Sequence, residues 1–326
     1  MKVLHITNAY PTEKYPTYGV FIKEQVQSLV KNGVLCEILF VNGREKGYLA
    51  YLKSIYKLRR ISKKFDLIHC HHAYSAYTFV LSCVKKPFIV SFLSPKNWEV
   101  KKGIIHRYFY SQILKKCAGF IVKDDPTINT RNAKGYYLPN GVDLDFFKPI
   151  EKKNAFNHIA IVPATYILFV SNGDGIKRPE KRYSLFKATV ELVNKKYNLN
   201  AVELILTNVE RSKVPYYFNA ASVHLLTSDV EGSPNSVKES LACNIPVVST
   251  DVGNVKELIS SVTGCYISPV NDSDILSDLV YKAIQLSSIK GRESLINNKL
   301  DMDSVSHRLI SIYKKILDKK LFSEKK

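Results

Sequence analysis

Long apolar segments are missing from this sequence, and their absence excludes a membrane-spanning protein. No run reaches the roughly 20 residues that a bilayer-spanning helix needs. The longest candidates, at 73–84 and 158–170, are interrupted by polar residues or by Pro163. The first residues run directly into a strand-like stretch at 2–6, so we expect no secretory signal. We therefore expect a cytoplasmic protein, with a peripheral position on the inner face of the membrane left open.

Metal-binding and nucleotide-binding signatures of the common kinds are also missing. The six cysteines form no CxxC motif and stand mostly in strand-like or helical stretches. We expect them to be buried free thiols in a reducing cytoplasm. The glycine patterns of a Walker loop and of a dinucleotide-binding turn are absent too.

Acidic residues are scarce relative to basic ones. The chain has 29 Asp and Glu against 48 Lys and Arg, which gives a net charge of +19. Such an excess favours an anionic partner: nucleic acid, anionic lipid or a phosphorylated substrate. A general bias towards lysine explains part of it. No DNA- or RNA-binding motif accompanies the charge, so we expect no nucleic acid partner.

Strand-like runs alternate with amphipathic helical stretches, which is typical of parallel α/β domains. We expect strands at 2–6, 35–41, 66–70, 87–92 and 118–122 in the first half of the chain. In the second half we expect strands at 166–171, 202–207, 222–227, 246–249 and 264–268.

The length of 326 residues is enough for two such domains. Charged and polar connectors within 144–165 mark the division. We expect an N-terminal domain over 1–150 and a C-terminal domain over 151–300. At 301–326 we expect a helix that packs back towards the N-terminal domain, followed by a basic tail.

The stretch 222–253 combines several signals of a ligand site. An apolar run precedes a loop and then a helix, with Ser233 as the predicted N-cap and Pro234 at the first helical position. Two glutamates, Glu231 and Glu239, stand eight positions apart around the start of this helix. In a parallel sheet, ligands bind at the carboxyl ends of strands and the amino ends of the following helices. The free N–H groups there favour an anion such as a diphosphate. These groups belong to Asn235, Ser236 and Val237.

Two loops in other parts of the chain add to this site. The loop 172–182 joins glycines to a cluster of basic residues at a strand end, which can hold phosphates. Taken alone, a solvated charged turn would be the better interpretation. Gly19 ends the loop after the first strand and would let the backbone approach a ligand closely, although an ordinary turn glycine is the alternative.

Three histidines, His69, His71 and His72, end the strand expected at 66–70. A histidine cluster invites a zinc hypothesis. Positions i and i+2 of a strand place only His69 and His71 on one face, and no fourth ligand is near in sequence. We therefore expect no metal, and we interpret His71 and His72 as polar contacts to a substrate. Structural histidines are the alternative.

Residues 44–64 form a predicted amphipathic helix with a basic face. Its tyrosine, leucine and isoleucine residues recur at helical spacing, and eight lysines and arginines stand between them. This pattern suits an anionic membrane surface. A helix packed on its own domain explains the pattern equally, and both roles can coexist on different faces.

Three motifs together resemble those of the family-four retaining glycosyltransferases, which have a GT-B fold. They are EGSPNSVKESLACNIPVVSTDVG from Glu231, LPNGVDLDFFKP at 138–149 and RPEKR at 178–182. The loop that ends at Gly19 resembles the N-terminal glycine loop of that family. The resemblance covers essentially the whole chain and is strongest from 138 to 270. It implies an α/β fold class with two Rossmann-like domains facing across a cleft.

The resemblance also implies roles for individual residues. Glu231 would face the donor sugar, while Lys181 and Arg178, which we favour over Arg182, would neutralise the leaving diphosphate. Glu239 would bind the ribose. The implied donor-binding residues are Gly19, Ser233, Pro234, Asn235, Ser236, Val237 and Glu239. No metal and no other cofactor is implied, because fixed positive groups and a helix dipole take the place of a cation.

The implied activity is a retaining transfer of a hexosyl or N-acetylhexosaminyl group from a nucleotide-sugar. A UDP-sugar is favoured, and GDP- or ADP-sugars stay open. The acceptor would be a saccharide or lipid-linked saccharide in surface polysaccharide or glycolipid synthesis, contacted by His71, His72 and Ser94. Two alternatives stay open: a catalytically inactive scaffold of the same fold and a nucleic-acid-binding protein. The NGVD and EGSPN motifs argue against a sugar-nucleotide epimerase.

Overall fold

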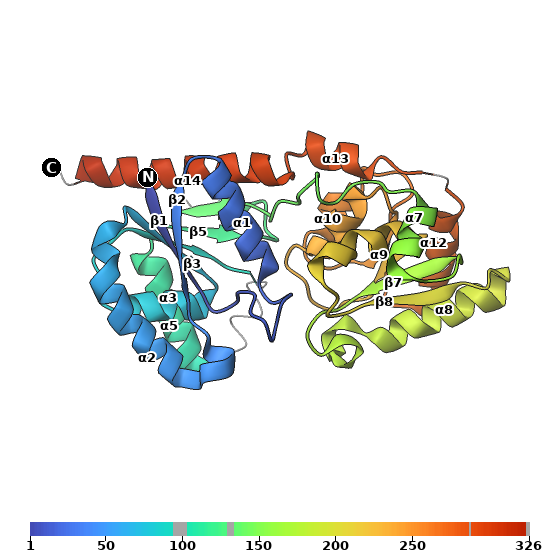
Figure 1. Ribbon diagram of the computed structural model, residues 1–326, viewed down its shortest axis with the longest axis horizontal. Helices are drawn as coiled ribbons and strands as arrows, with labels where there is room; N and C mark the ends of the chain where they lie inside the picture. Colours follow the sequence, from blue (N-terminus) through green and yellow to red (C-terminus); the bar gives the residue numbers. More distant parts are fainter. Residues whose placement is uncertain (94–102, 129–133, 287, 324–326) are drawn as a thin grey trace. The chain divides into compact units, whose positions relative to one another are not determined.

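The computed structural model describes residues 1–93, 103–128, 134–286 and 288–323 (Figure 1). The chain divides into two compact units. The first unit holds residues 1–12, 19–141 and those from 302 onwards, and the second holds 13–18 and 142–301. The division after Gly141 lies inside the LPNGVDLDFFKP motif and precedes the boundary that we expected at residue 150.

The first unit is built on a six-stranded parallel sheet with the order β2-β1-β3-β4-β5-β6. The strands are β1 (Lys2–Thr7), β2 (Leu35–Phe40), β3 (Leu67–His71), β4 (Phe88–Ser91), β5 (Gly119–Val122) and β6 (Gly135–Tyr137). The helices are α1 (Val20–Lys31), α2 (Gly43–Ile61), α3 (Ala73–Leu81), α5 (Ile104–Lys116) and α14 (Met302–Ser323). A short 3₁₀ turn, η1 (Ser62–Lys64), follows α2. All five strands expected in this half are present, and β6 is an addition.

Helix α14 completes the core of the first unit, although it comes last in the sequence (Figure 1). Five of its side chains share one buried cluster with residues of α1, β1, β3, β4 and β5. Near its amino end, the Asp303 carboxylate accepts a hydrogen bond from Lys31 Nζ at 3.3 Å. Ser306 Oγ donates to Ser28 Oγ at 2.8 Å. The residues of the buried cluster on α14 are Val305, Leu309, Ile312, Tyr313 and Ile316.

The second unit is built on a five-stranded parallel sheet with the order β11-β10-β9-β7-β8. The strands are β7 (Tyr166–Val170), β8 (Val202–Leu206), β9 (Val223–Leu226), β10 (Val247–Thr250) and β11 (Tyr266–Ser268). The helices are α7 (Lys152–Ile159), α8 (Tyr183–Tyr197), α9 (Val214–Ala220), α10 (Asn235–Ala242), α11 (Val255–Ile259), α12 (Ser273–Ile284) and α13 (Gly291–Asn297). The 3₁₀ turns are η2 (Gly175–Lys177), η3 (Pro179–Lys181) and η4 (Arg211–Lys213).

Both faces of the second sheet are covered by apolar side chains. Successive residues of a strand point to opposite faces, so Leu168 of β7 belongs to one buried cluster and Ile167 belongs to another. This burial on both faces explains why the strands read as continuous apolar runs. The α/β fold with two parallel sheets, expected from the sequence, is confirmed.

Two further sequence expectations concern membranes and thiols. Among the described residues, we find no helix with both the length and the apolar character needed to cross a bilayer. Four of the six free cysteines are buried. Cys36 is half-buried and Cys83 is exposed, so the expectation of buried thiols is wrong at these two positions.

Candidate active site

Helix α10 begins at Asn235, one residue later than expected. Pro234 has φ −64° and ψ 122°, which is extended backbone, so it is the N-cap and not the first helical residue. The predicted cap, Ser233, instead accepts a hydrogen bond through Oγ from Lys238 Nζ at 2.9 Å. The N–H groups of the first helical turn still stand at the helix start, where they have no acceptor within the helix.

Lys181 and Glu231 come together at the carboxyl ends of β7 and β9. Lys181 Nζ lies 2.5 Å from Glu231 Oε1. Ser228 Oγ donates to the same oxygen at 2.8 Å. The two charged side chains are only 13% and 16% exposed, respectively. One carboxylate oxygen therefore receives two hydrogen bonds, which hold the Glu231 side chain in one orientation.

The loop that carries Lys181 is tied to the loop that carries Glu231 by three more bonds. Thr227 Oγ1 donates to the Lys181 carbonyl at 2.8 Å, and Asp229 N–H donates to the Glu180 carbonyl at 2.9 Å. Arg182 Nη1 forms an ion pair with Asp229 Oδ1 at 3.2 Å. The position of Lys181 is thus fixed by its backbone as well as by its charge.

Arg178, the other predicted catalytic cation, is bound within its own loop. Its Nε and Nη2 both donate to Glu180 Oε1, at 2.8 and 2.5 Å. Its Nη1 donates to the Asn172 carbonyl at 3.4 Å. The structure therefore brings Lys181 to Glu231 but places Arg178 on Glu180. The catalytic role of Arg178 stays a prediction.

Glu239 has a partner that the sequence analysis missed. Its carboxylate is 8% exposed, and Oε1 lies 2.8 Å from Arg211 Nη1. The Arg211 guanidinium also stands over two rings of the LPNGVDLDFFKP motif, 4.8 Å from the centre of Phe147 and 5.5 Å from that of Phe146. Arg211 follows β8, and its position at a strand's carboxyl end was the one signal in the sequence that pointed to it.

Comparisons with known proteins show which family and which structures this chain is similar to. Residues 185–302 match the family described as "Glycosyl transferases group 1". The chain thus resembles group 1 glycosyltransferases over most of its second unit. It is 24% identical to TuaC of Bacillus subtilis strain 168, a glycosyltransferase named for teichuronic acid biosynthesis, over 82% of this chain and 86% of that protein.

Solved structures of other proteins have the same fold as this chain. Sucrose-phosphate synthase of Thermosynechococcus elongatus aligns with a TM-score of 0.73 at 13% identity, over 97% of this chain and 99% of that one. HepE of Anabaena, solved in complex with UDP and glucose, aligns with a TM-score of 0.73 at 12% identity, over 97% and 100%. Both confirm the expected GT-B fold, and the transferase class of enzyme is confirmed by the family.

The last glycine of the stretch 222–253, to which we assigned no role, shapes the loop that carries Glu231. Gly253 has φ +55°, and a Cβ atom there would lie 2.2 Å from the carbonyl oxygen of Gly232. The next residue, Asn254, donates its N–H to that same carbonyl at 3.0 Å. The turn after β10 therefore packs against the loop that carries Glu231, and only glycine permits so close an approach of the two backbones.

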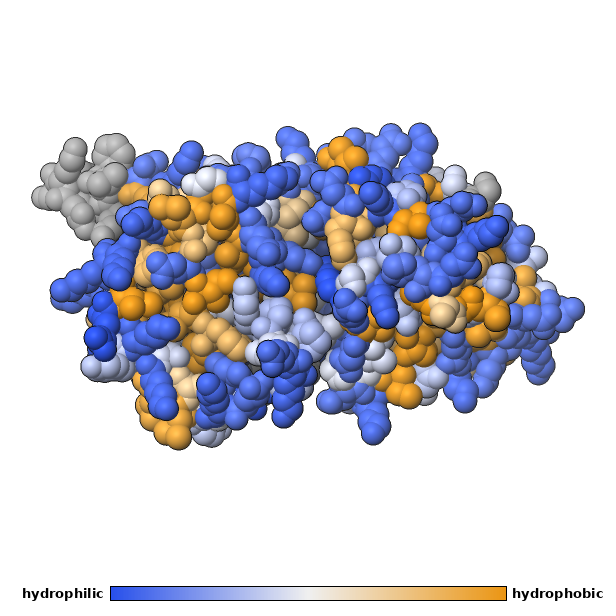
Figure 2. All heavy atoms as spheres, in the orientation of Figure 1, coloured by the Kyte–Doolittle hydropathy of each residue, from blue (hydrophilic) through white to orange (hydrophobic). Residues whose placement is uncertain are grey.

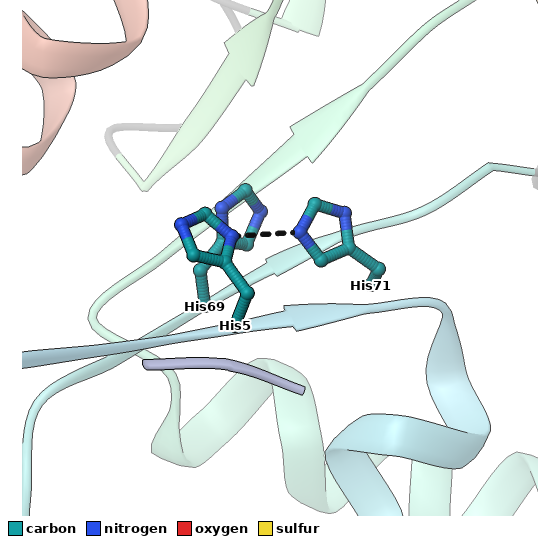
Figure 3. Close-up of side chains that lie close together, drawn as sticks. All are labelled: His5, His69 and His71. Atoms are coloured by element: carbon teal, nitrogen blue, oxygen red, sulfur yellow. Dashed lines mark hydrogen bonds between the residues drawn. The ribbon is translucent and has the colours of Figure 1, made fainter. Parts of the chain in front are cut away.

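In the first unit, His5, His69 and His71 form a buried cluster (Figure 3). His5 Nδ1 lies 3.0 Å from His71 Nε2. His69 bonds on both sides, through Nδ1 to the Tyr313 hydroxyl at 2.6 Å and through Nε2 to Ser91 Oγ at 2.8 Å. Burial lowers the pKa of His5 to about 3 and the pKa values of the other two well below 6.5.

These three imidazoles are therefore neutral at ordinary pH, the state in which histidine can bind a metal. One nitrogen from each lies within 4.8 Å of the others. The hydrogen bonds to Tyr313 and Ser91 nevertheless occupy both nitrogens of His69. His69 thus has a structural role, whereas His5 Nε2 is buried without a hydrogen-bond partner among the described residues. The expected absence of a metal stays a prediction.

The remaining predicted residues fall in different surroundings. His71 is 1% exposed, so its ring has no surface for an acceptor, and the predicted direct contact is wrong. His72 is half-buried and has φ +76°. Gly19 has φ +71°, and a Cβ atom there would lie 2.3 Å from the Ala9 carbonyl oxygen. The close approach of the Ala9 backbone therefore requires glycine at this position. Ser94 lies outside the described residues.

Proposed function

We propose that this protein is a group 1 glycosyltransferase that transfers a sugar, with retention, from a nucleotide-sugar to a saccharide or lipid-linked saccharide. The observation that carries the proposal is the contact between Lys181 Nζ and Glu231 Oε1 beside the start of α10. A fixed cation, a fixed carboxylate and the N–H groups of a helix start suit a sugar diphosphate, in which both positive and negative charge develop during transfer.

The donor in this proposal is a UDP-sugar, with GDP- and ADP-sugars as alternatives. Its diphosphate accepts hydrogen bonds from the N–H groups of Asn235, Ser236 and Val237, and it forms an ion pair with Lys181. Glu239 accepts hydrogen bonds from the ribose hydroxyls, with Arg211 holding the carboxylate in place. The structural likeness to HepE, which was solved with UDP and glucose, supports UDP as the nucleotide.

In the proposed reaction the bond between the sugar C1 and the phosphate oxygen lengthens first. The ring gains oxocarbenium character, which the Glu231 carboxylate stabilises without forming a covalent bond. The departing phosphate oxygen accepts the proton of the acceptor hydroxyl, which attacks C1 from the same face. Lys181 and the helix start stabilise the negative charge on the diphosphate, and a contribution of about 3 kcal/mol is typical for one such donor. No metal is needed for this step.

The acceptor in this proposal binds the first unit, and His72 is the residue we assign to it. A non-glycine residue at φ +76° costs roughly 1–3 kcal/mol, and such strain concentrates at functional sites. The basic residues of α2 place the enzyme on an anionic membrane surface, on the cytoplasmic side. The likeness to TuaC supports a role in surface polysaccharide synthesis.

Saturation-transfer NMR with UDP-, GDP- and ADP-sugars tests the donor. We expect signals from the nucleotide and the sugar of at least the UDP compounds. Binding to none of the three classes would overturn the proposal and favour an inactive scaffold.

Two further measurements address chemistry. The anomeric configuration of the product, read by NMR, should match that of the donor, and an inverted product would contradict retention. Turnover should persist in excess EDTA, and its loss would contradict a metal-free step.

Flotation with vesicles tests the membrane assignment. The enzyme should float with phosphatidylglycerol vesicles and stay behind with phosphatidylcholine vesicles, because lysine and arginine bind anionic headgroups. Equal behaviour with both compositions would contradict the assigned role of α2.

A further inference from the structure

Helices α2 and α3 of the first unit enclose a groove of about 540 Å³. This volume falls within the roughly 300–1,000 Å³ typical of small-molecule sites. Helix α2 contributes Tyr48, Tyr51 and Ile55, and α3 contributes Tyr74, Tyr77 and Leu81. The lining is thus aromatic and aliphatic, and several of these side chains are exposed although they are large: Tyr48 at 90%, Leu81 at 49% and Tyr74 at 41%.

The path of α2 opens this groove at its amino end. Gly47 has φ +57° and ψ −153°, which interrupts the helical backbone and kinks the helix. Glycine tolerates this conformation at no steric cost, and a Cβ atom at Gly47 would meet nothing within 4 Å. Both Gly43 and Gly47 line the groove. At this end, two residues without side chains therefore line the groove.

The polar side chains that line the groove are four tyrosines, whose rings are largely apolar, and Thr78. Thr78 is 2% exposed, and its Oγ1 donates to the Tyr74 carbonyl within α3 at 3.1 Å. Helix α3 has no charged residue between Ala73 and Leu81. A sugar would need several convergent hydrogen-bonding groups, whereas a hydrocarbon chain needs only apolar contact.

The surroundings of the groove carry strong positive charge. Residues 43–64 contain eight lysines and arginines and one acidic residue, Glu45. All eight basic residues are exposed, and Arg44 and Lys46 are each adjacent in sequence to a glycine that lines the groove. On the face shown in Figure 2, hydrophobic side chains gather over α2 and α3 among hydrophilic ones. The groove therefore complements a molecule that joins a hydrocarbon chain to an anionic group.

We propose that this groove binds the hydrocarbon chain of a lipid-phosphate-linked acceptor, with the phosphates held by the basic residues of α2. The proposal rests on the transferase function above and names the class of its acceptor. A bilayer surface would be met by protruding side chains such as Leu52, which is 62% exposed and does not line the groove. A concave aromatic groove is suited to one chain drawn out of the bilayer.

Two leucines provide a matched pair of variants. Leu81→Asp places a carboxylate in the groove, and Leu52→Asp places the same carboxylate on exposed surface of α2 outside it. The probe is farnesyl diphosphate, titrated calorimetrically into the full-length protein, with inorganic diphosphate as the probe that has no chain. Melting curves, and binding of a UDP-sugar that the unsubstituted protein binds in the NMR test above, show whether each variant is folded.

We expect farnesyl diphosphate to bind more tightly than inorganic diphosphate. Leu81→Asp should weaken it about tenfold or more, because burial of one leucine is worth that much affinity. Leu52→Asp should leave it unchanged, and neither variant should alter inorganic diphosphate binding. Equal effects of the two variants on farnesyl diphosphate, or no preference for the farnesyl chain, would overturn the proposal.

Two other outcomes assign the groove to a different occupant. Equal loss of vesicle flotation in both variants, with farnesyl diphosphate binding intact, would indicate that the face formed by α2 and α3 contacts the bilayer. A concentration-dependent dimer that only Leu81→Asp disrupts would make it a contact between copies of this chain. If UDP-sugar binding fails in the unsubstituted protein, the proposed function is wrong, whereas a failure confined to farnesyl diphosphate removes only the acceptor assignment.

Discussion

Replacing Lys181 by methionine tests the centre of the proposed site. The substitution keeps the length of the side chain but removes the charge that lies 2.5 Å from Glu231 Oε1. Glu231, which is 16% exposed, then keeps the hydrogen bond from Ser228 Oγ and loses its ion pair. Loss of a partner to a charged group costs roughly 1.5–3 kcal/mol. We expect the loss of stability in this variant to lie near the lower end of that range, because water can still reach the Glu231 carboxylate.

The effect of Lys181→Met on catalysis should be much larger than its effect on stability. Removal of one group that stabilises charge in the transition state lowers kcat by about 100- to 1,000-fold. In contrast, the melting temperature should fall by only a few degrees, at about 2–4 °C for each kcal/mol. The assay is release of the nucleoside diphosphate at saturating donor, together with a thermal melt of the same preparation.

Lys196→Met is the control for this variant. Lys196 lies on α8 and forms ion pairs with Asp274 and Asp278, each at 2.8 Å, so the same substitution again removes contacts to carboxylates. Its pairs are more exposed and lie away from Glu231, and such surface pairs contribute little to stability. We expect near-normal kcat. A folded Lys181→Met enzyme with kcat within about threefold of normal would refute the catalytic assignment, since one positioned charge should be worth far more.

Three more predictions follow from the structure. Glu239→Ala should weaken UDP binding by about tenfold, because two hydrogen bonds to ribose hydroxyls are lost; calorimetry measures it, and unchanged affinity would contradict the ribose assignment. Gly253→Ala should destabilise the protein by roughly 1–3 kcal/mol and weaken donor binding, because its Cβ would clash with the Gly232 carbonyl; urea unfolding measures it, and normal stability would show that the turn can shift freely. Burial lowers the pKa of His224 to about 3. As the pH falls, His224 therefore binds a proton in the unfolded chain before it does so in the folded chain. The free energy of unfolding should fall as the pH drops below about 6.5, by about 1.4 kcal/mol per pH unit for this residue. His224→Phe should reduce that slope in urea titrations between about pH 7 and about pH 5, and an unchanged slope would contradict the assignment.

Local patterns predicted every strand of the two sheets except β6, and they singled out Glu231 and Lys181. Glu231 and Lys181 each stand just beyond an apolar strand, and parallel strands bring their carboxyl ends to one edge of a sheet. Sequence spacing could not show that the two side chains touch, because β7 and β9 are neighbours only in the folded sheet. The start of α10 was misplaced by one residue, since proline fixes φ but leaves ψ open.

The residues that sequence reasoning missed depend on pairing between distant segments. His5 joins His69 only because β1 and β3 are paired in the register that sets these two residues side by side. Arg211 reaches Glu239 across 28 positions of sequence. The backbone of Gly253 packs closely against the Gly232 carbonyl in the loop that carries Glu231, and the amino-acid composition does not reveal this contact. Each of these contacts is set by tertiary structure, and local sequence patterns do not show which distant residues it brings together.

The place of α14 has a consequence for how this chain matures. The sheet of the first unit is complete by Tyr137, yet the side chains that seal one of its clusters begin at Val305. During synthesis, the nascent first unit therefore exposes apolar surface until the whole second unit has been made. The hydrogen bond between His69 and the Tyr313 hydroxyl likewise cannot form until α14 has been synthesised. The N-terminal half is thus a dependent folding unit, and the last helix acts as the closing step of its assembly.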